Sequence, residues 1–252
     1  MMLKKISILN DNYIWIIYNI YKECVIIDPG TSNDVIKTII KEKWTPIAIL
    51  LTHKHKDHIN GVEKIKKKYP EIIIYGPSEI NHIPIDIIVY EGMVIKLLYR
   101  KFIVLFTPGH TYGHVSYYSN PYIFCGDVIF SGGCGYVDNN QYIEMYNSIK
   151  KILSLPNNTL LCCSHEYTLS NLIFSISIVP DDIEIKKYYI LVKKKIKTKK
   201  STLPTLLLYE RKINLFLRTH ETILKKSIGI SDKSNSFKTF VALRLKKNLF
   251  KK

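Results

Sequence analysis

Seven residues near position 50 constrain the fold of this chain more than any other segment. The apolar run Ile47–Leu51 is followed at once by Thr52-His53-Lys54-His55-Lys56-Asp57-His58. Three imidazoles and a carboxylate are costly to bury together unless a partner satisfies them. Imidazole nitrogen and carboxylate oxygen are also the ligands that zinc and similar divalent metals take in open, catalytic sites. The segment therefore predicts a metal site at the end of a buried strand.

The spacing of these ligands suits two metals rather than one. A loop at a strand end can splay alternate side chains, so that His53 and His55 face one ion while Asp57 and His58 face another. Paired metals in catalytic sites lie ~3.5 to 4 Å apart. Four ligands within six residues can serve such a pair.

Three further candidate ligands each follow another predicted strand. They are His110 in Thr107-Pro108-Gly109-His110, Asp127 in Cys125-Gly126-Asp127, and His165 at the end of Thr159–Cys163. The strand ends of α/β folds are the usual place for ligand sites. Five of the chain's 8 histidines fall in the combined set, so random scatter explains it poorly.

Two other polar residues are candidates for holding the ligands in place. Asp28 follows a predicted strand, where it can be a ligand, a hydrogen-bond partner of a ligand or a turn residue. We favour the partner role, because carboxylates commonly orient metal-bound histidines from behind. His114 is interpreted in the same way, with a purely structural hydrogen bond as the equal alternative. His82 and His220 have no ligand spacing around them and are interpreted as structural.

The first two-thirds of the chain alternates predicted strands and helices. Short apolar runs rich in β-branched and aromatic residues predict eight strands, and three stretches with helical spacing predict helices. Strand pairs with helices between them indicate two mixed sheets covered outside by helices. The strands are Ile14–Tyr18, Cys24–Ile27, Ile47–Leu51, Ile72–Tyr75, Ile103–Phe106, Val115–Tyr118, Tyr122–Cys125 and Thr159–Cys163; the helices are Val35–Lys43, Val62–Lys68 and Tyr142–Leu153.

From Thr168 onward the pattern changes to helices alone. Apolar residues at three-to-four spacing predict four of them, at Leu169–Ile178, Ile183–Lys199, Leu206–Leu217 and Phe237–Leu249. We therefore expect an α/β unit over residues 1–165 and a smaller helical unit over residues 166–252.

The net charge of +16 is concentrated in that helical unit. Residues 166–252 carry 20 of the 37 Lys+Arg but only 7 of the 21 Asp+Glu. Clustered cations attract phosphates, which favours a nucleic-acid partner. Lysine, isoleucine, asparagine and tyrosine abound throughout the chain, however, so we interpret the excess as compositional drift on a solvated face and expect no nucleic-acid partner.

Compartment and membrane association follow from the apolar runs and the cysteines. No apolar stretch approaches the roughly 20 residues that cross a bilayer, and the N-terminal segment does not resemble a secretion signal. The five cysteines are an odd number and lack C-x-x-C spacing. We expect reduced thiols in a cytoplasmic, membrane-free protein.

Taken together, these residues resemble the metallo-β-lactamase superfamily over the whole chain. The shared pattern is His53-x-His55-x-Asp57-His58, then His110, Asp127 and His165. Further segments resemble its glyoxalase II branch, the hydroxyacylglutathione hydrolases. They are Asp11-Asn12-Tyr13-Ile14-Trp15, Thr107-Pro108-Gly109-His110-Thr111-x-Gly113-His114, Phe124-Cys125-Gly126-Asp127, Phe130-Ser131-Gly132-Gly133-Cys134-Gly135 and His165-Glu166-Tyr167-Thr168.

The resemblance implies a fold and a set of metal ligands. The fold is an αββα sandwich followed by a smaller helical domain that helps to hold glutathione. Two divalent metals are implied, usually zinc, with iron or manganese tolerated. One metal would be bound by His53, His55 and His110, the other by Asp57, His58 and His165. Asp127 would bridge them, and Asp57 and Asp127 are the expected catalytic carboxylates.

The resemblance also implies a substrate and a reaction. Tyr167 matches a residue at the glutathione peptide, while Arg244 and Lys247 match the pair that meets the glycine carboxylate. The expected reaction is hydrolysis of S-(2-hydroxyacyl)glutathione, such as S-D-lactoylglutathione, to glutathione and D-lactate by a monomer. It is the second step of methylglyoxal detoxification.

Three other functions share parts of the pattern. They are an RNA nuclease of the same superfamily, a mononuclear-iron persulfide dioxygenase, and a non-catalytic relative with a decayed substrate site. The sequence also departs from its relatives at three positions. Tyr136 stands where Lys or Arg is usual, Asp138 where an aromatic residue is usual, and Asn248 where Asp is usual. We expect the first two to alter substrate affinity while leaving the metal ligands unchanged.

Overall fold

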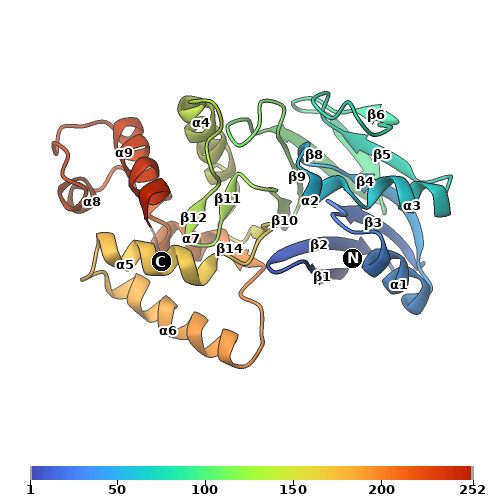
Figure 1. Cartoon of the computed structure of the whole chain (residues 1–252), viewed down its shortest axis with the longest axis horizontal. Helices are drawn as coiled ribbons and strands as arrows, with labels where there is room; N and C mark the ends of the chain where they lie inside the picture. Colours follow the sequence, from blue (N-terminus) through green and yellow to red (C-terminus); the bar gives the residue numbers. More distant parts are fainter. Residues whose placement is uncertain (1, 251–252) are drawn as a thin grey trace.

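Two six-stranded mixed sheets form the larger part of the molecule (Figure 1), a computed structural model that describes residues 2–250. The first sheet has the order β1 (Met2–Ile8), β2 (Asn12–Tyr18), β3 (Glu23–Ile27), β4 (Thr45–Leu50), β5 (Ile73–Gly76) and β6 (Ile87–Ile88). The second has the order β14 (Thr205–Leu206), β13 (Leu160–Cys162), β10 (Tyr122–Phe124), β9 (Val115–Ser119), β8 (Arg100–Phe106) and β7 (Val94–Leu97). A small hairpin is formed by β11 (Ile129–Phe130) and β12 (Gly133–Cys134).

Strand β2 shows why the first sheet is buried on both faces. Successive side chains of a strand point to opposite faces. Tyr13, Trp15 and Ile17 belong to the core that the first sheet shares with the second. Ile14 and Ile16 belong to a separate core beneath the helices. An almost unbroken apolar run is the sequence that such a strand requires.

Helices α1 (Asn33–Glu42) and α3 (Val62–Lys68) cover the outer face of the first sheet. Each contributes apolar residues at helical spacing to the second core, among them Val35, Ile39, Val62 and Ile65. Between β4 and α3 lies a single helical turn, α2 (Lys56–Ile59). Helix α4 (Tyr142–Leu153) buries Met145, Ile149 and Ile152 in the large core.

The chain after residue 165 is helical apart from β14. Its helices are α5 (Thr168–Ile178), α6 (Ile183–Lys197), α7 (Leu207–Ile213), the short 3-10 helix η1 (Leu215–Leu217), α8 (Thr222–Ser227) and α9 (Ser236–Leu249). In Figure 1 they gather at one end of the sandwich, in yellow to red. Their buried residues continue the large core of the sheets, so a single apolar core joins the two parts of the chain.

All eight predicted strands are present, and α3 and α4 have the predicted bounds. One predicted helix, Leu206–Leu217, is divided into α7 and η1, because the side chain of Asn214 accepts a hydrogen bond from Phe216 N and caps η1. The sequence pattern misses β1, β6, β7, β11, β12, β14, α2 and α8. Most of these have only two to four residues, too few to show a period.

Two predictions from composition can be compared with the structure. No helix among the described residues is both long enough and apolar enough to cross a bilayer. All five cysteines are buried and none forms a disulfide. The buried free thiols agree with the expectation of reduced cysteines.

A buried carboxylate on α7 ties the helical part to the β11–β12 hairpin. One oxygen of Glu210 accepts hydrogen bonds from Ser131 Oγ at 2.7 Å and Thr205 Oγ1 at 3.1 Å. The other accepts from Gly132 N at 2.8 Å and lies 3.4 Å from Asn214 Nδ2. Burial raises the pKa of Glu210 above its ordinary value, although these four donors oppose the shift.

Replacing Glu210 by Ala should destabilise the protein by about 2–4 kcal/mol, because a buried donor left without an acceptor costs ~1–3 kcal/mol. Urea unfolding measures this loss, with Glu63→Ala on the exposed face of α3 as the control. A loss below ~1 kcal/mol would show that the hairpin does not depend on the carboxylate.

Candidate metal centre

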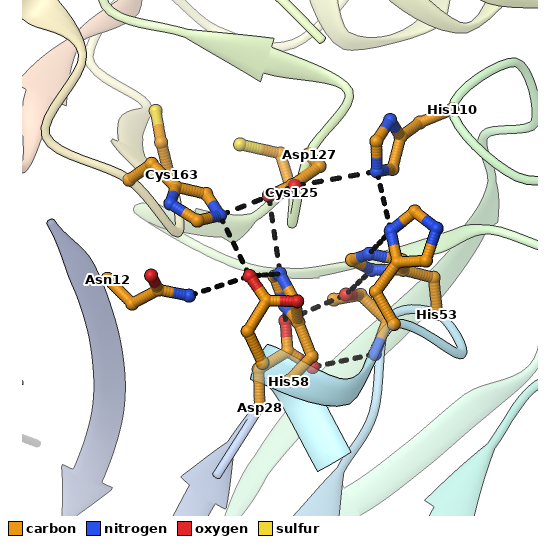
Figure 2. Close-up of polar contacts among 12 residues, drawn as sticks. Asn12, Asp28, His53, His58, His110, Cys125, Asp127 and Cys163 are labelled. Carbon is orange, nitrogen blue, oxygen red and sulfur yellow. Dashed lines mark hydrogen bonds and ion pairs between the residues drawn. The ribbon is translucent and has the colours of Figure 1, made fainter. Parts of the chain in front are cut away.

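The structure brings all seven predicted metal ligands together at one edge of the sandwich (Figure 2). His53 lies just beyond β4, His110 in the loop after β8, Asp127 between β10 and β11, and His165 just beyond β13. The predicted loop is present over residues 51–55, but residues 56–59 form the short helix α2, which begins directly after His55. The turn of α2 carries Asp57 and His58, and the ring of His58 lies beside that of His53, with centroids 4.1 Å apart.

Three imidazoles form the first group of ligands. His55 Nδ1 lies 3.0 Å from His53 Nε2 and 3.0 Å from His110 Nε2. Nitrogen ligands bound at about 2.0–2.1 Å around a tetrahedral zinc ion are roughly 3.3 Å apart. The spacing of the three nitrogens is thus close to what one ion requires.

Asp57, His58 and His165 form the second group. Asp57 Oδ2 lies 3.7 Å from His58 Nε2 and 3.5 Å from His165 Nε2. The three ligand atoms lie within 4.8 Å of one another, so they too can surround one ion.

Asp127 lies between the two groups, and Figure 2 shows its carboxylate directed toward His110 and His58. Its Oδ2 is 3.5 Å from His110 Nε2 and 3.4 Å from His165 Nε2, and its Oδ1 is 3.5 Å from His58 Nε2. One carboxylate therefore faces a ligand of the first group and two ligands of the second.

Two buried atoms in this cluster test whether metal ions fit it. His58 Nε2 and Asp127 Oδ1 are shielded from solvent and have no hydrogen-bond partner within the described chain. A buried polar atom without a partner costs free energy, and a cation between the two would satisfy both. The donor set of nitrogen and oxygen atoms is also the one that divalent zinc, iron and manganese accept.

The charges of the cluster stabilise one another. Burial would lower the pKa of His58, but Asp127 and Asp28 raise it well above its ordinary value. Burial would likewise raise the pKa of Asp127, but His58 and His165 lower it well below. Burial and neighbouring imidazoles keep the pKa of His53 low. The carboxylates thus favour positive charge on the groups around them. His53 stays neutral, and the neutral imidazole is the form that binds a metal ion.

The two residues expected behind the ligands both contact the cluster. Asp28 accepts hydrogen bonds from Thr52 N and Thr52 Oγ1, and its Oδ2 lies 3.0 Å from His58 Nδ1. His114 Nε2 accepts from the backbone N–H of Asp127 at 3.3 Å. His114 Nδ1 lies 3.1 Å from the hydroxyl of Thr107.

Several residues that form hydrogen bonds to the predicted ligands were not among the candidates identified from the sequence. Asp11 Oδ1 lies 2.8 Å from His165 Nδ1, and Asn12 Nδ2 donates to Asp57 Oδ2 at 2.9 Å. Thr52 Oγ1 lies 2.9 Å from His53 Nδ1, and the carbonyl of Tyr136 accepts from His110 Nδ1. Asp11 and Asn12 belong to a segment that resembles the family, which is the one signal in the sequence that could have identified them. Their contacts with His165 and Asp57 cannot be read from the sequence, because these residues lie far apart in the chain.

A cavity of about 270 Å³ lies beside the cluster. The ring of Tyr167 stacks on the ring of His165, with centroids 4.8 Å apart and an angle of 9° between planes. All three residues predicted to bind substrate line this cavity. The lining is Phe130, Cys134, Tyr136, Tyr167, Ser170, Asn171, Arg244 and Lys247. A larger cavity, of about 530 Å³, lies at the β7–β8 turn, and no predicted ligand lines it.

The two predicted cations of this cavity come from α9. Arg244 Nη1 donates to the carbonyl of Cys134 at 2.9 Å and its Nε donates to Asn248 Oδ1 at 3.1 Å. Lys247 Nζ lies 3.4 Å from the carbonyl of Ser170 and 4.9 Å from the ring centre of Phe174. These contacts hold both cations at the cavity through neutral groups.

The departures at positions 136 and 138 differ in their location. Tyr136 lines the cavity and its side chain is exposed, so this position presents an aromatic ring where a cation is usual. Asp138 is not among the lining residues. Its backbone N–H donates to the carbonyl of Gly109, and its carboxylate accepts from Asn139.

Comparison with known proteins places this arrangement in a family. A model described as the metallo-beta-lactamase superfamily matches residues 10–94 and 80–165, and one described as the hydroxyacylglutathione hydrolase C-terminus matches residues 166–250. The chain is 54% identical over 250 residues to the hydroxyacylglutathione hydrolase of Buchnera aphidicola subsp. Acyrthosiphon pisum, which covers 99% of this chain and 100% of that protein. The chain belongs to the hydroxyacylglutathione hydrolase family.

Other relatives of this family member agree with that placement. Over 229 residues it is 48% identical to the hydroxyacylglutathione hydrolase of Salmonella paratyphi B, which covers 91% of each chain. Its superfamily and the names of its relatives support a metal-dependent hydrolase.

Solved structures confirm the predicted fold. The B3 metallo-beta-lactamase BLEG-1 has a TM-score of 0.61 and 30% identity, covering 65% of this chain and 91% of that chain. The structure of TTHA1623 in a di-iron-bound form has a TM-score of 0.55 and 26% identity, covering 66% and 92%. With the match of the C-terminal model, the metallo-β-lactamase sandwich followed by a helical domain is confirmed.

Gly135 offers a steric test of how closely Asp127 is held. A Cβ at position 135 would lie 1.8 Å from the carbonyl oxygen of Asp127, so Gly135→Ala must displace that backbone. We expect metal affinity about 10-fold lower or worse, in the range caused by disturbing a ligand's support. Equilibrium dialysis against zinc measures it. Gly76→Ala is the control, because its Cβ would meet only flexible side chains at 3.1–3.5 Å, and equal zinc affinity in both variants would contradict the prediction.

Proposed function

We propose that this chain hydrolyses S-(2-hydroxyacyl)glutathione, with S-D-lactoylglutathione as the typical substrate and D-lactate and glutathione as products. The observation that carries the proposal is the stacking of Tyr167 on His165, because one aromatic ring borders both the ligand cluster and the cavity. A molecule in the cavity would therefore present its reacting group to the cluster. The hydroxyacylglutathione hydrolases of similar sequence support the choice of substrate.

We propose that His53, His55 and His110 hold one divalent ion, that Asp57, His58 and His165 hold the other, and that Asp127 lies between them. Zinc is the ion we propose, with iron or manganese as substitutes, and the di-iron form of TTHA1623 supports a two-metal site in this fold. Such ions, when bound, lower the pKa of water towards ~7 and polarise a carbonyl oxygen.

The protein's own contribution is to fix the ligands and the substrate. Asn12 donates a hydrogen bond to the carboxylate of Asp57, and His114 accepts one from the backbone N–H of Asp127, which fixes the chain from which that side chain projects. The leaving group is a thiol of pKa roughly 8.5, which departs as thiolate without help from a strong acid. No side chain is therefore needed as a proton donor.

The cavity supplies the charge that a glutathione carboxylate requires. Arg244 and Lys247 both line it, and both are cationic at neutral pH. The ring of Tyr167 offers an apolar surface to the peptide. Tyr136 adds a second ring at this cavity but no charge.

We also propose that the protein acts as a monomer in the cytoplasm, without a nucleic-acid partner. The buried free cysteines support a reducing compartment. We propose a domain boundary between residues 165 and 166, which the bounds of the two matching family models support.

The decisive assay is hydrolysis of S-D-lactoylglutathione, followed at the thioester absorbance. The purified protein should hydrolyse it, lose activity on chelation and regain it with zinc. Asp127→Ala should lower both turnover and bound metal, because it removes the group that faces both halves of the cluster. Full activity of this variant with both metals bound would refute its role. Salt-sensitive RNA cleavage without thioester hydrolysis would favour a nuclease instead.

Tyr136→Arg should lower KM for S-D-lactoylglutathione by about threefold to fivefold with little change in kcat. An added exposed ion pair contributes up to ~1 kcal/mol, and the new cation would lie at the same cavity as Arg244 and Lys247. Tyr99→Arg controls for total charge, because Tyr99 is exposed at the β7–β8 turn and does not line the cavity that contains Tyr136. An unchanged KM in Tyr136→Arg would show that position 136 does not contact the substrate.

A further inference from the structure

The loop of residues 107–114 carries two residues of the cluster, His110 and His114. On one side it is held by α4 and by the segment after β12. Ser148 Oγ donates to the carbonyl of Pro108 at 2.7 Å, and the backbone of Met145 packs so closely on Gly109 that a Cβ there would lie 2.5 Å from it. These contacts fix the beginning of the loop, and a backbone hydrogen bond from Thr107 N to the carbonyl of His114, at 2.9 Å, closes its end.

The middle of the loop, Thr111 to Gly113, is held by Glu79, which lies in the turn after β5 of the other sheet. Its Oε1 accepts a hydrogen bond from Thr111 Oγ1 at 2.5 Å and its Oε2 accepts from Gly113 N at 2.9 Å. Thr111 is buried, so its hydroxyl depends on a protein partner. A Cβ at Gly113 would lie 2.7 Å from Glu79 Cγ, so glycine leaves room for the glutamate.

These two hydrogen bonds are made by the residues next to His110 and His114 in the chain. Thr111 follows His110, whose Nε2 lies 3.0 Å from His55 Nδ1. Gly113 precedes His114, which accepts from the backbone of Asp127. One carboxylate thus fixes the loop on both sides of Tyr112, between the two histidines. The ligands of the second group, Asp57, His58 and His165, lie on other segments.

We propose that Glu79 is a positioning residue that sets the affinity of the metal site formed by His53, His55 and His110. The proposal rests on the metal binding proposed above, not on the identity of the substrate. Without the carboxylate, residues 111–113 lose their side-chain anchor, and His110 is held less firmly in the position that the other two imidazoles require. The site formed by Asp57, His58 and His165 keeps its ligands.

Zinc titration of the apoprotein against a chromophoric chelator tests this proposal. Glu79→Ala should weaken one of the two zinc sites by about 10–100-fold, the range for residues that support metal ligands, and change the other by less than about threefold. Glu79→Gln should bind both ions almost as wild type does. Its amide oxygen can accept from Gly113 N while its NH2 group donates to the Thr111 hydroxyl, which has lone pairs to accept.

Two further variants make the result decisive. Glu71→Ala, at an exposed position just before β5, is the matched control and should bind zinc as wild type does. Thr111→Val removes only the hydroxyl that donates to Glu79 Oε1, and it should cause an intermediate loss of zinc affinity at the same site. This variant tests the proposal if Glu79→Ala does not fold. Equal affinity in Glu79→Ala and wild type overturns the proposal, as does equal weakening of both sites.

The same titration separates this proposal from the proposed reaction. If the wild-type protein binds two zinc ions but does not hydrolyse S-D-lactoylglutathione, the proposed reaction is refuted. The zinc affinities of the Glu79 variants then still test the role of Glu79. A wild-type protein that binds no zinc would overturn both.

Discussion

The structure depends on polar contacts that hold the predicted ligands of a crowded, buried cluster from behind. Imidazoles and carboxylates at 3.0–3.7 Å from one another resist burial unless each is fixed in orientation and charge. Six of the seven predicted ligands have such a support within residues 2–250, whereas the hydrogen bonds of the His55 side chain there go to His53 and His110. The supports are Thr52 for His53, Asn12 for Asp57, Asp28 for His58, Tyr136 for His110, His114 for Asp127 and Asp11 for His165. The geometry of the cluster is therefore set from outside it.

The helical part of the chain reaches the cluster through the ring of Tyr167, which stacks on His165, and through the β11–β12 hairpin. Glu210 holds Ser131 and Gly132 at the turn between β11 and β12, and Arg244 holds the carbonyl of Cys134 at its end. The chain continues directly into Gly135, which touches the backbone of Asp127. The residues that line the cavity and the residue between the two ligand groups therefore share one support. The buried apolar residues of the sheets and of the helical part also form one continuous core.

Only a few residues set the charge of the cavity beside the cluster, although the net charge of the whole chain is large. The chain carries a formal charge of +16, but the cavity beside the cluster is lined by two cations, Arg244 and Lys247. Most of the other lysines of the helical part lie on exposed faces such as that of α6. In this structure the local arrangement, rather than the total charge, determines what the cavity can bind.

The sequence by itself indicated the seven candidate ligands and determined most of the strands. Strands buried on both faces need unbroken apolar runs, so β2, β3, β4 and β10 are visible in the pattern. Ligand chemistry restricts the residue types that can follow them. The family resemblance also singled out Tyr167, Arg244 and Lys247, which the structure places around one cavity.

Only the tertiary structure decided how these residues are held and which others join them. Asp11 and Asn12 contact predicted ligands 154 and 45 positions away in the chain, and Glu79 contacts Thr111 and Gly113 across 32 and 34 positions. No periodicity or spacing records such contacts, because sheet pairing and packing bring them about. Strands of two residues such as β14 are equally hidden, since they form only when a neighbouring strand offers its free edge.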